Sequence, residues 1–155
     1  MGGTIKMKLT VRIATFGDIV ILKTFLETAQ LNTQGINEMI DSFLIMEDED
    51  GQLKATIGME QFGASGLLRS LVVTASTSEN DLLSLFNEMF LLAKNKEIKD
   101  LYLATNKLGA MKFVEVLGFE PVDKDQIPMA FLSSEHVKHI LTVDNSVFLK
   151  HSILY

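Results

Sequence analysis

Hydrophobic and polar residues alternate along LTVRIA (9–14), a period-2 pattern that predicts a β-strand. The following segment, TFGDIVILKTFLETAQL (15–31), has apolar residues at helical spacing and predicts a helix with Thr15 or Asp18 as its N-cap. A short second helix is expected over INEMIDS (36–42). The chain is therefore expected to begin with one strand and two helices.

Three strands are expected next. FLIMEDEDGQLKATIGMEQF contains two apolar runs, 43–46 and 54–62, around an acidic turn that ends at Gly51, which is typical of a β-hairpin. LLRSLVV (67–73) follows a second glycine-containing turn and is apolar enough to lie in the centre of a sheet. These runs predict three consecutive strands.

The second half of the chain alternates helices and strands. ENDLLSLFNEMFLLAKNKE (79–97) has a wide apolar helical face, KDLYLAT (99–105) predicts a strand, and the next helix is expected to end at Gly118. A short strand, one or two short helices and a closing strand over 146–155 complete the pattern. We expect an α/β (α+β) fold with a mixed, mostly antiparallel sheet of about seven strands and helices on both faces.

The composition favours one folded domain. The 155 residues are 47% hydrophobic and 22% charged, which is typical of a chain with a sizeable core. We expect the domain to span 8–155, with 1–7 as an N-terminal extension or an expression remnant. No apolar run approaches the roughly 20 residues that a membrane-spanning helix needs, and the N-terminus lacks the apolar core of a signal peptide.

Charge and residue usage restrict the possible partners. A net charge of −6 argues against a general nucleic-acid or anionic-membrane surface. The absence of cysteine excludes a thiol nucleophile and thiolate metal sites, and it fits a cytoplasmic location. His136 and His139 are three residues apart but lack a clear third ligand, so no metal site is expected. Exposed edge strands would allow a homodimer.

The element order, taken with KFVEVLGFEPV (112–122), resembles the GNAT superfamily of acyl-CoA-dependent N-acetyltransferases. In that family the last helix typically carries Ala-x-x-Phe-Tyr-x-x-x-Gly-Phe. Here Ala110, Phe113, Gly118 and Phe119 occupy the matching positions. LRSLVV is similar to the family's fourth strand, and DLYLAT followed by Asn106 is similar to its fifth.

A narrower resemblance rests on GMEQFGASGLLRSLVV, LGFEPVDKDQIP and the downstream SSEH. Together these look like the amino-acid acetyltransferase branch, which includes glutamate N-acetyltransferase-like proteins and small acetyltransferases found with arsenic-resistance genes. The resemblance implies transfer of an acetyl group from acetyl-CoA to the amine of a small molecule, an amino acid being one candidate. Two other hypotheses stay open: a catalytically impaired sensor or interaction module, and an acyltransferase with a different acyl donor.

The resemblance also implies how acetyl-CoA would be held. The backbone of the fourth strand, at Leu71, Val72 and Val73, would bond the pantetheine arm as an added strand does. The next loop would bind the pyrophosphate through amides at a helix N-terminus. Asn106 and Phe113 are further candidate contacts.

In that loop the family pattern is Arg/Gln-x-x-Gly-x-Gly/Ala, and this sequence departs from it. The positions that are basic or glycine in the family fall on Ser78, Glu79, Asp81 and Leu83, and Asn80 and Leu82 complete the segment. A carboxylate about 6 Å from a phosphate oxygen costs roughly 1–3 kcal/mol. Two interpretations stay open: weak acetyl-CoA binding through backbone amides, or a well-capped helix start and nothing more.

The catalytic groups are less clear. The family's tyrosine acid falls on Val114, and neither Tyr102 nor Tyr155 matches it. Glu60, near the end of the predicted strand 54–62, is a candidate base; a surface glutamate is the competing interpretation. Arg69 lies in an otherwise apolar strand, where it would bind a substrate carboxylate or form a structural salt bridge, for example with Glu60.

Overall fold

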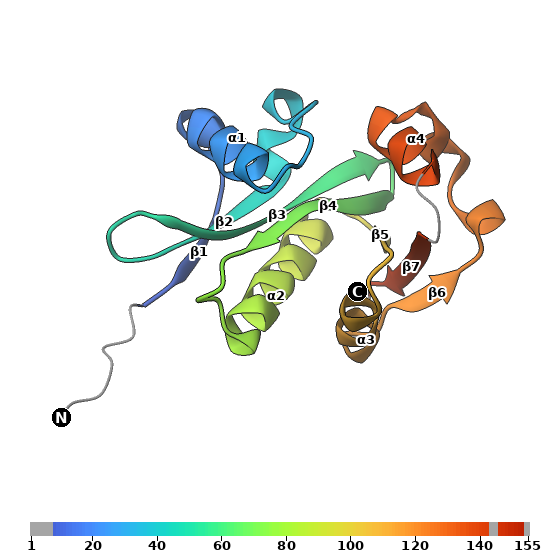
Figure 1. The fold of residues 1–155 in the computed structure, drawn as a ribbon. Coiled ribbons are helices and arrows are strands. Elements are labelled where there is room, and N and C mark those ends of the chain that lie inside the picture. Colours follow the sequence, from blue (N-terminus) through green and yellow to red (C-terminus); the bar gives the residue numbers. More distant parts are fainter. Residues whose placement is uncertain (1–7, 143–145, 154–155) are drawn as a thin grey trace. The chain divides into compact units, whose positions relative to one another are not determined.

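The computed structural model describes residues 8–142 and 146–153 (Figure 1). Its seven strands form one hydrogen-bonded sheet in the order β1-β2-β3-β4-β5-β7-β6. Pairing is antiparallel for β1–β2, β2–β3, β5–β7 and β6–β7 and parallel for β4–β5. The strands are β1 (Thr10–Ile13), β2 (Phe43–Glu47), β3 (Leu53–Phe62), β4 (Ser65–Val73), β5 (Asp100–Thr105), β6 (Glu120–Val122) and β7 (Val147–Ser152).

The helices follow the predicted order. The described residues form α1 (Ile19–Thr28), α2 (Glu79–Asn95), α3 (Leu108–Val116) and α4 (Glu135–Thr142), together with the 3-10 helices η1 (Phe16–Asp18), η2 (Asn37–Ser42), η3 (Lys124–Gln126) and η4 (Met129–Ser133). The predicted mixed, mostly antiparallel sheet is therefore confirmed. The last two residues of the predicted closing strand, 154–155, lie outside the described residues.

The chain divides into two compact units. The first comprises the chain up to Met59 together with Arg69–Leu92, and the second comprises Glu60–Leu68 together with the chain from Ala93 onward. The core of the first unit includes Leu22 and Leu26 of α1, with Phe43 and Ile45 of β2. A Cβ atom at Gly58 of β3 would collide with the Phe43 ring, so that strand position requires glycine.

In the first unit, Arg12 of β1 links the start of α1 to β2. Its Nη1 and Nη2 atoms donate to the two Asp18 oxygens at 2.7 and 2.8 Å, and its Nε donates to Glu47 at 2.8 Å. The Arg12 guanidinium holds the pKa of the Asp18 carboxyl well below its usual range. Asp18 also accepts a hydrogen bond from the Thr15 amide at 2.7 Å, so both predicted N-cap residues take part at this helix start.

The second unit has its own core. Tyr102 of β5, Phe131 of η4, Val137 of α4 and Phe148 of β7 are buried together there. The Tyr102 ring meets the Phe131 ring edge-on, with centroids 5.1 Å apart. The parallel pairing of β4 with β5 also lies in this unit and runs from Ser65–Asp100 to Leu67–Tyr102.

Helix α3 ends where the sequence predicts. The Phe119 and Gly118 amides donate to the carbonyls of Val114 and Glu115, and Gly118 has φ = 103°, the left-handed form of a Schellman ending. Nδ1 of His151 lies 3.1 Å from the Gly118 oxygen, and a Cβ at Gly118 would come within 2.8 Å of that nitrogen. Both the turn and this close contact require glycine.

Candidate active site

The end of β4 supplies the predicted acetyl-CoA strand. Leu71 and Val73 are 42% and 43% exposed, whereas Val72 packs against the core of the first unit. The Thr74 amide, just past the strand, donates to the Lys54 carbonyl of β3 at 3.0 Å. The strand thus keeps two apolar side chains exposed over the segment predicted to bind pantetheine.

Arg69 of β4 is 6% exposed, and its side chain reaches η2 and the segment that precedes it. Its Nη2 donates to the Asn32 carbonyl at 3.4 Å, and its Nη1 lies 3.8 Å from the Met39 sulfur. Its Nε donates to the Ser70 hydroxyl at 3.2 Å. These contacts hold the guanidinium beside Asn32, Met39 and Ser70, and its carboxylate role remains a prediction.

Ser70 has φ = 57° within β4, a left-handed conformation in the middle of a strand. Such a conformation costs a non-glycine residue roughly 1–3 kcal/mol. The residue before it, Arg69, is buried, and the residue after it, Leu71, is exposed. The irregular backbone therefore lies directly between the candidate carboxylate-binding arginine and the candidate pantetheine-binding segment.

At the start of α2, Ser78 and Asp81 bond to each other's backbone amides. The Ser78 amide donates to Oδ2 of Asp81 at 3.1 Å, and the Asp81 amide donates to the Ser78 hydroxyl at 3.1 Å. This reciprocal pair is a capping box. The Leu82 amide continues into the helix by donating to the Ser78 carbonyl. The well-capped helix start that the sequence allows is therefore present, with Ser78 as the cap residue and Asp81 as its reciprocal partner.

This capping box limits what the α2 N-terminus can offer a phosphate. Two amides of the predicted pyrophosphate segment are bonded to side chains of the same segment. Within the described part of the chain, the amides of Glu79 and Asn80 have no protein acceptor. A phosphate there would meet two donors and the helix dipole, with the Asp81 carboxylate on the adjacent amide.

Glu60, the candidate base, is held by a residue that the sequence does not single out. Its Oε1 accepts a hydrogen bond of 2.9 Å from the Ser134 hydroxyl. Ser134 is 5% exposed, and its oxygen also accepts from the Val137 amide at 3.2 Å, which makes it the N-cap of α4. Serine before the helical segment 135–142 signals a cap, but nothing local indicates its bond to β3.

The remaining candidates lie on β5, on α3 and in the loop between them. Val114, at the family's tyrosine position, is 4% exposed and packed inward, so this helix presents no acid there. Asn106 is exposed in the β5–α3 loop, and Phe113 is half-buried on α3. Burial raises the pKa of Tyr102, which agrees with a packing role for that residue.

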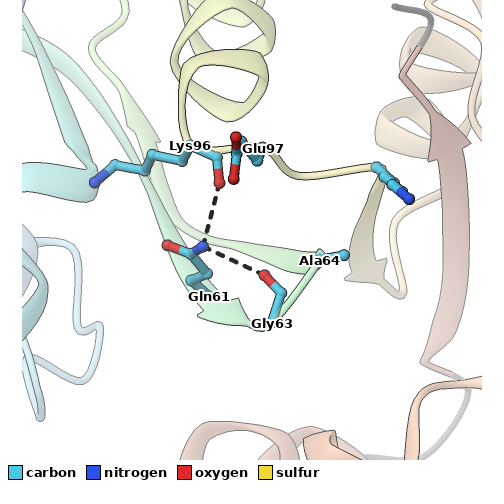
Figure 2. A pocket seen from close by; sticks show the side chains of 6 residues that line it. Gln61, Gly63, Ala64, Lys96 and Glu97 are labelled. Atoms are coloured by element: carbon cyan, nitrogen blue, oxygen red, sulfur yellow. Dashed lines mark hydrogen bonds between the residues drawn. The ribbon is translucent and has the colours of Figure 1, made fainter.

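A surface cleft of about 480 Å³ lies in the second unit, next to the turn between β3 and β4 (Figure 2). Gln61 spans it, donating from Nε2 to the carbonyls of Gly63 and Lys96 at 3.3 and 3.4 Å. The cleft adjoins the start of β4 and the end of α2, a helix of 17 residues and therefore about 25 Å long.

Among the described residues, no helix is long and apolar enough to cross a membrane. Within the same residues, no group of three or more His, Cys, Asp or Glu side chains could hold a metal ion. The His136 side chain lies outside the described set.

No protein-family model matches the chain. The uncharacterised protein YwlB of Bacillus subtilis (strain 168) is 29% identical over 140 residues, which amount to 90% of this chain and 94% of YwlB. The two chains are thus similar over nearly their whole lengths.

Solved structures identify the fold. N-acetylglutamate synthase from Neisseria gonorrhoeae, complexed with coenzyme A and N-acetyl-glutamate, matches 97% of this chain with a TM-score of 0.77 at 17% identity. This chain spans 36% of that synthase chain. An acetyltransferase of the GNAT family from Staphylococcus aureus Mu50 matches 95% of this chain and 100% of its own, with a TM-score of 0.76 at 15% identity. The chain therefore has the fold of the GNAT acetyltransferases.

Proposed function

We propose that this protein is an acetyl-CoA-dependent N-acetyltransferase that acts on the amine of a small molecule. The observation that carries the proposal is the fold match over 97% of the chain to an N-acetylglutamate synthase complexed with coenzyme A. Fold alone does not fix function. The proposal therefore also needs groups in this chain that can hold the donor, deprotonate the amine and orient the acceptor.

For the donor, we assign the pantetheine arm to the backbone of Leu71–Val73 and the pyrophosphate to the amides of Glu79 and Asn80. A helix N-terminus stabilises an anion by roughly 0.3–2 kcal/mol, and the two backbone amides add hydrogen bonds. The nearby carboxylates oppose binding by a comparable amount. Acetyl-CoA binding is therefore expected to be weak.

The reaction joins an amine nitrogen to the acetyl carbon and breaks the carbon–sulfur bond of the thioester. The ammonium group of the acceptor first gives one proton to Glu60, directly or through water, so that its nitrogen carries a lone pair. After attack, the nitrogen loses a second proton and the CoA thiolate gains one. Because position 114 is valine, the thiolate takes that proton from water or directly from the nitrogen that has attacked, and positioning supplies much of the acceleration.

For the acceptor, we propose that Arg69 binds a carboxylate, which makes an α-amino acid or an analogue the substrate class. Its planar guanidinium suits two-point contact with a carboxylate. The contacts of Arg69 with Asn32 and Met39 hold the side chain in one orientation. Such an ordered cation recognises a carboxylate at little further entropic cost.

Calorimetric titration with acetyl-CoA and with CoA is the decisive experiment. We expect binding in the range of tens to hundreds of micromolar, about −5 to −6 kcal/mol. No heat of binding at millimolar ligand would overturn the proposal. Turnover is then measured by thiol release in the presence of amino acids and of amines that lack a carboxylate.

Arg69→Met tests the acceptor assignment. We expect KM for a carboxylate-bearing amine to rise about tenfold or more, because a charged hydrogen bond contributes roughly 1.5–3 kcal/mol. CoA affinity should not change. Arg69→Lys is the matched control, since it keeps the charge but loses the planar fork. Equal losses for both ligands would contradict a carboxylate role.

A second candidate function is a ligand sensor without catalysis. Two observations favour it: the capping box that closes the α2 N-terminus and the buried valine at position 114. Titration separates the two functions. A sensor would bind CoA or an amino acid without releasing thiol, whereas an acetyltransferase would do both.

A further inference from the structure

The contact between Glu60 and Ser134 joins two parts of the second unit that are 74 residues apart in the sequence. Glu60 comes from the end of β3, and Ser134 lies directly before α4. Two residues further along β3, on the same face of the strand, the Phe62 ring meets Phe131 of η4 with centroids 4.6 Å apart. The polar and the aromatic contact together fix the η4–α4 segment on the end of β3.

We propose that Ser134 is a positioning residue that orients Glu60 for proton abstraction. This inference rests on the proposed function, in which Glu60 is the base. The Ser134 hydroxyl donates to Oε1 of Glu60, which leaves Oε2 as the atom that takes the ammonium proton. The proton passes from the amine nitrogen to Oε2, no electron is transferred, and Ser134 keeps its own proton.

Ser134 is itself immobilised. Its oxygen accepts from the Val137 amide at 3.2 Å, and its hydroxyl proton points to Glu60 at 2.9 Å. Ser134 as a whole is 5% exposed, so little of the residue is open to solvent. A bond from a fixed donor restricts both the rotation of the carboxylate and the choice of oxygen, which is how a neighbouring group orients a base.

A simple capping role makes a different prediction, and two variants separate the roles. Ser134→Ala removes both the cap and the donor. Ser134→Gly also removes the donor, but glycine is a far better N-cap residue than alanine. We expect Ser134→Ala to lower Tm by several degrees and Ser134→Gly to lower it by about half as much or less.

Activity should not follow this order of stability. We expect kcat to fall about tenfold in both variants, a part of the 10²–10⁴-fold that a positioned base contributes, while KM for acetyl-CoA stays unchanged. If kcat is unchanged in either variant, or falls in Ser134→Ala but not in Ser134→Gly, Ser134 is only a cap and the inference is wrong.

A double-mutant cycle with Glu60→Gln tests whether Ser134 acts on kcat through Glu60. Glu60→Gln alone should lower kcat about a hundredfold. If Ser134 acts through Glu60, adding Ser134→Ala to Glu60→Gln should change kcat by less than about twofold. A further tenfold loss in the double variant would overturn the inference.

The cycle also distinguishes this inference from the proposed function. A wild-type protein that binds acetyl-CoA but turns over no amine would overturn the proposed function and the positioning role together. A wild-type protein that turns over amines, with a Ser134→Ala variant as fast as it, would overturn the positioning role alone. Glu60→Gln at full activity in an active enzyme would remove Glu60 as the base and the positioning role with it.

Discussion

Helices α2 and α4 both begin at a glutamate that follows a serine N-cap, Ser78-Glu79 and Ser134-Glu135, yet the two serines make different contacts. In α2 the serine and Asp81 bond to each other's amides and close the helix start. In α4 the serine accepts a hydrogen bond from the Val137 amide, and its hydroxyl donates a hydrogen bond to Glu60 of β3.

The difference lies in the third residue of each helix. Asp81 has a carboxylate that can reach back to the amide of the cap residue, and it does so. Val137 has no such group and is fully buried in the core of the second unit. At the α2 N-terminus the two capping side chains bond only to amides of the same turn, whereas at the α4 N-terminus the capping serine also bonds to Glu60 of β3. Whether a serine cap has a role beyond the helix thus depends on the residue three positions later and on whether another element brings an acceptor to the serine hydroxyl.

The largest effect is expected from converting α4 to the α2 pattern. Val137→Asp would place a carboxylate where a buried side chain now packs, which should lower the free energy of unfolding by about 3–5 kcal/mol. Val137→Ala is the control and should cost about half as much, because it only leaves a cavity. Urea unfolding measures both. A Val137→Asp variant as stable as Val137→Ala would show that the third position of α4 tolerates a capping carboxylate.

The next largest effect concerns anion binding at α2. Asp81→Asn removes a negative charge from the proposed pyrophosphate site, so CoA affinity should rise by about 1 kcal/mol, or fivefold, at low salt. Glu88→Gln makes the same charge change on an exposed position of the same helix, about 10 Å further along. It should have little effect. The gain for Asp81→Asn should shrink as salt is added. Calorimetry that finds equal affinities for the two variants would contradict a pyrophosphate site there.

The smallest effect is on the stability of α2. Ser78→Ala should lower the free energy of unfolding by about 1 kcal/mol, and Ser78→Gly by only a few tenths. Neither change should affect thiol release beyond about twofold, in contrast to the corresponding changes at Ser134. Thermal unfolding and initial rates, measured side by side, give both results. A tenfold lower kcat in Ser78→Gly would contradict the claim that only the Ser134 cap affects catalysis.

Local sequence patterns predict most of the fold. The alternating run at 9–14 corresponds to β1. Gly118 ends α3, and Ser78 caps α2. Each of these depends on residues within a few positions of one another, where spacing and propensity act directly. The element order, together with the family resemblance, predicts a mixed, mostly antiparallel sheet of about seven strands, as observed, but it does not predict that β7 lies between β5 and β6.

The candidate site is harder to predict because its contacts are not local. The bond between Glu60 and Ser134 and the one between Arg69 and the Asn32 carbonyl join residues 74 and 37 positions apart. Side-chain type indicates that Glu60 and Arg69 need partners, but it does not name them. The left-handed Ser70 also has no sequence signal, because glycine or asparagine is the usual residue in that conformation.

Ser70 has a consequence for the behaviour of the unfolded chain. Residues 66–73, GLLRSLVV, contain the apolar, β-prone residues from which cross-β fibrils form when they stack flat and in register. Arg69 and Ser70 interrupt this run with a charge and a polar residue at its centre. In the folded protein the same two residues are accommodated by a buried guanidinium and a left-handed turn of the backbone. The strain in the middle of β4 therefore accompanies protection against aggregation whenever the strand is released, for example during synthesis or thermal unfolding.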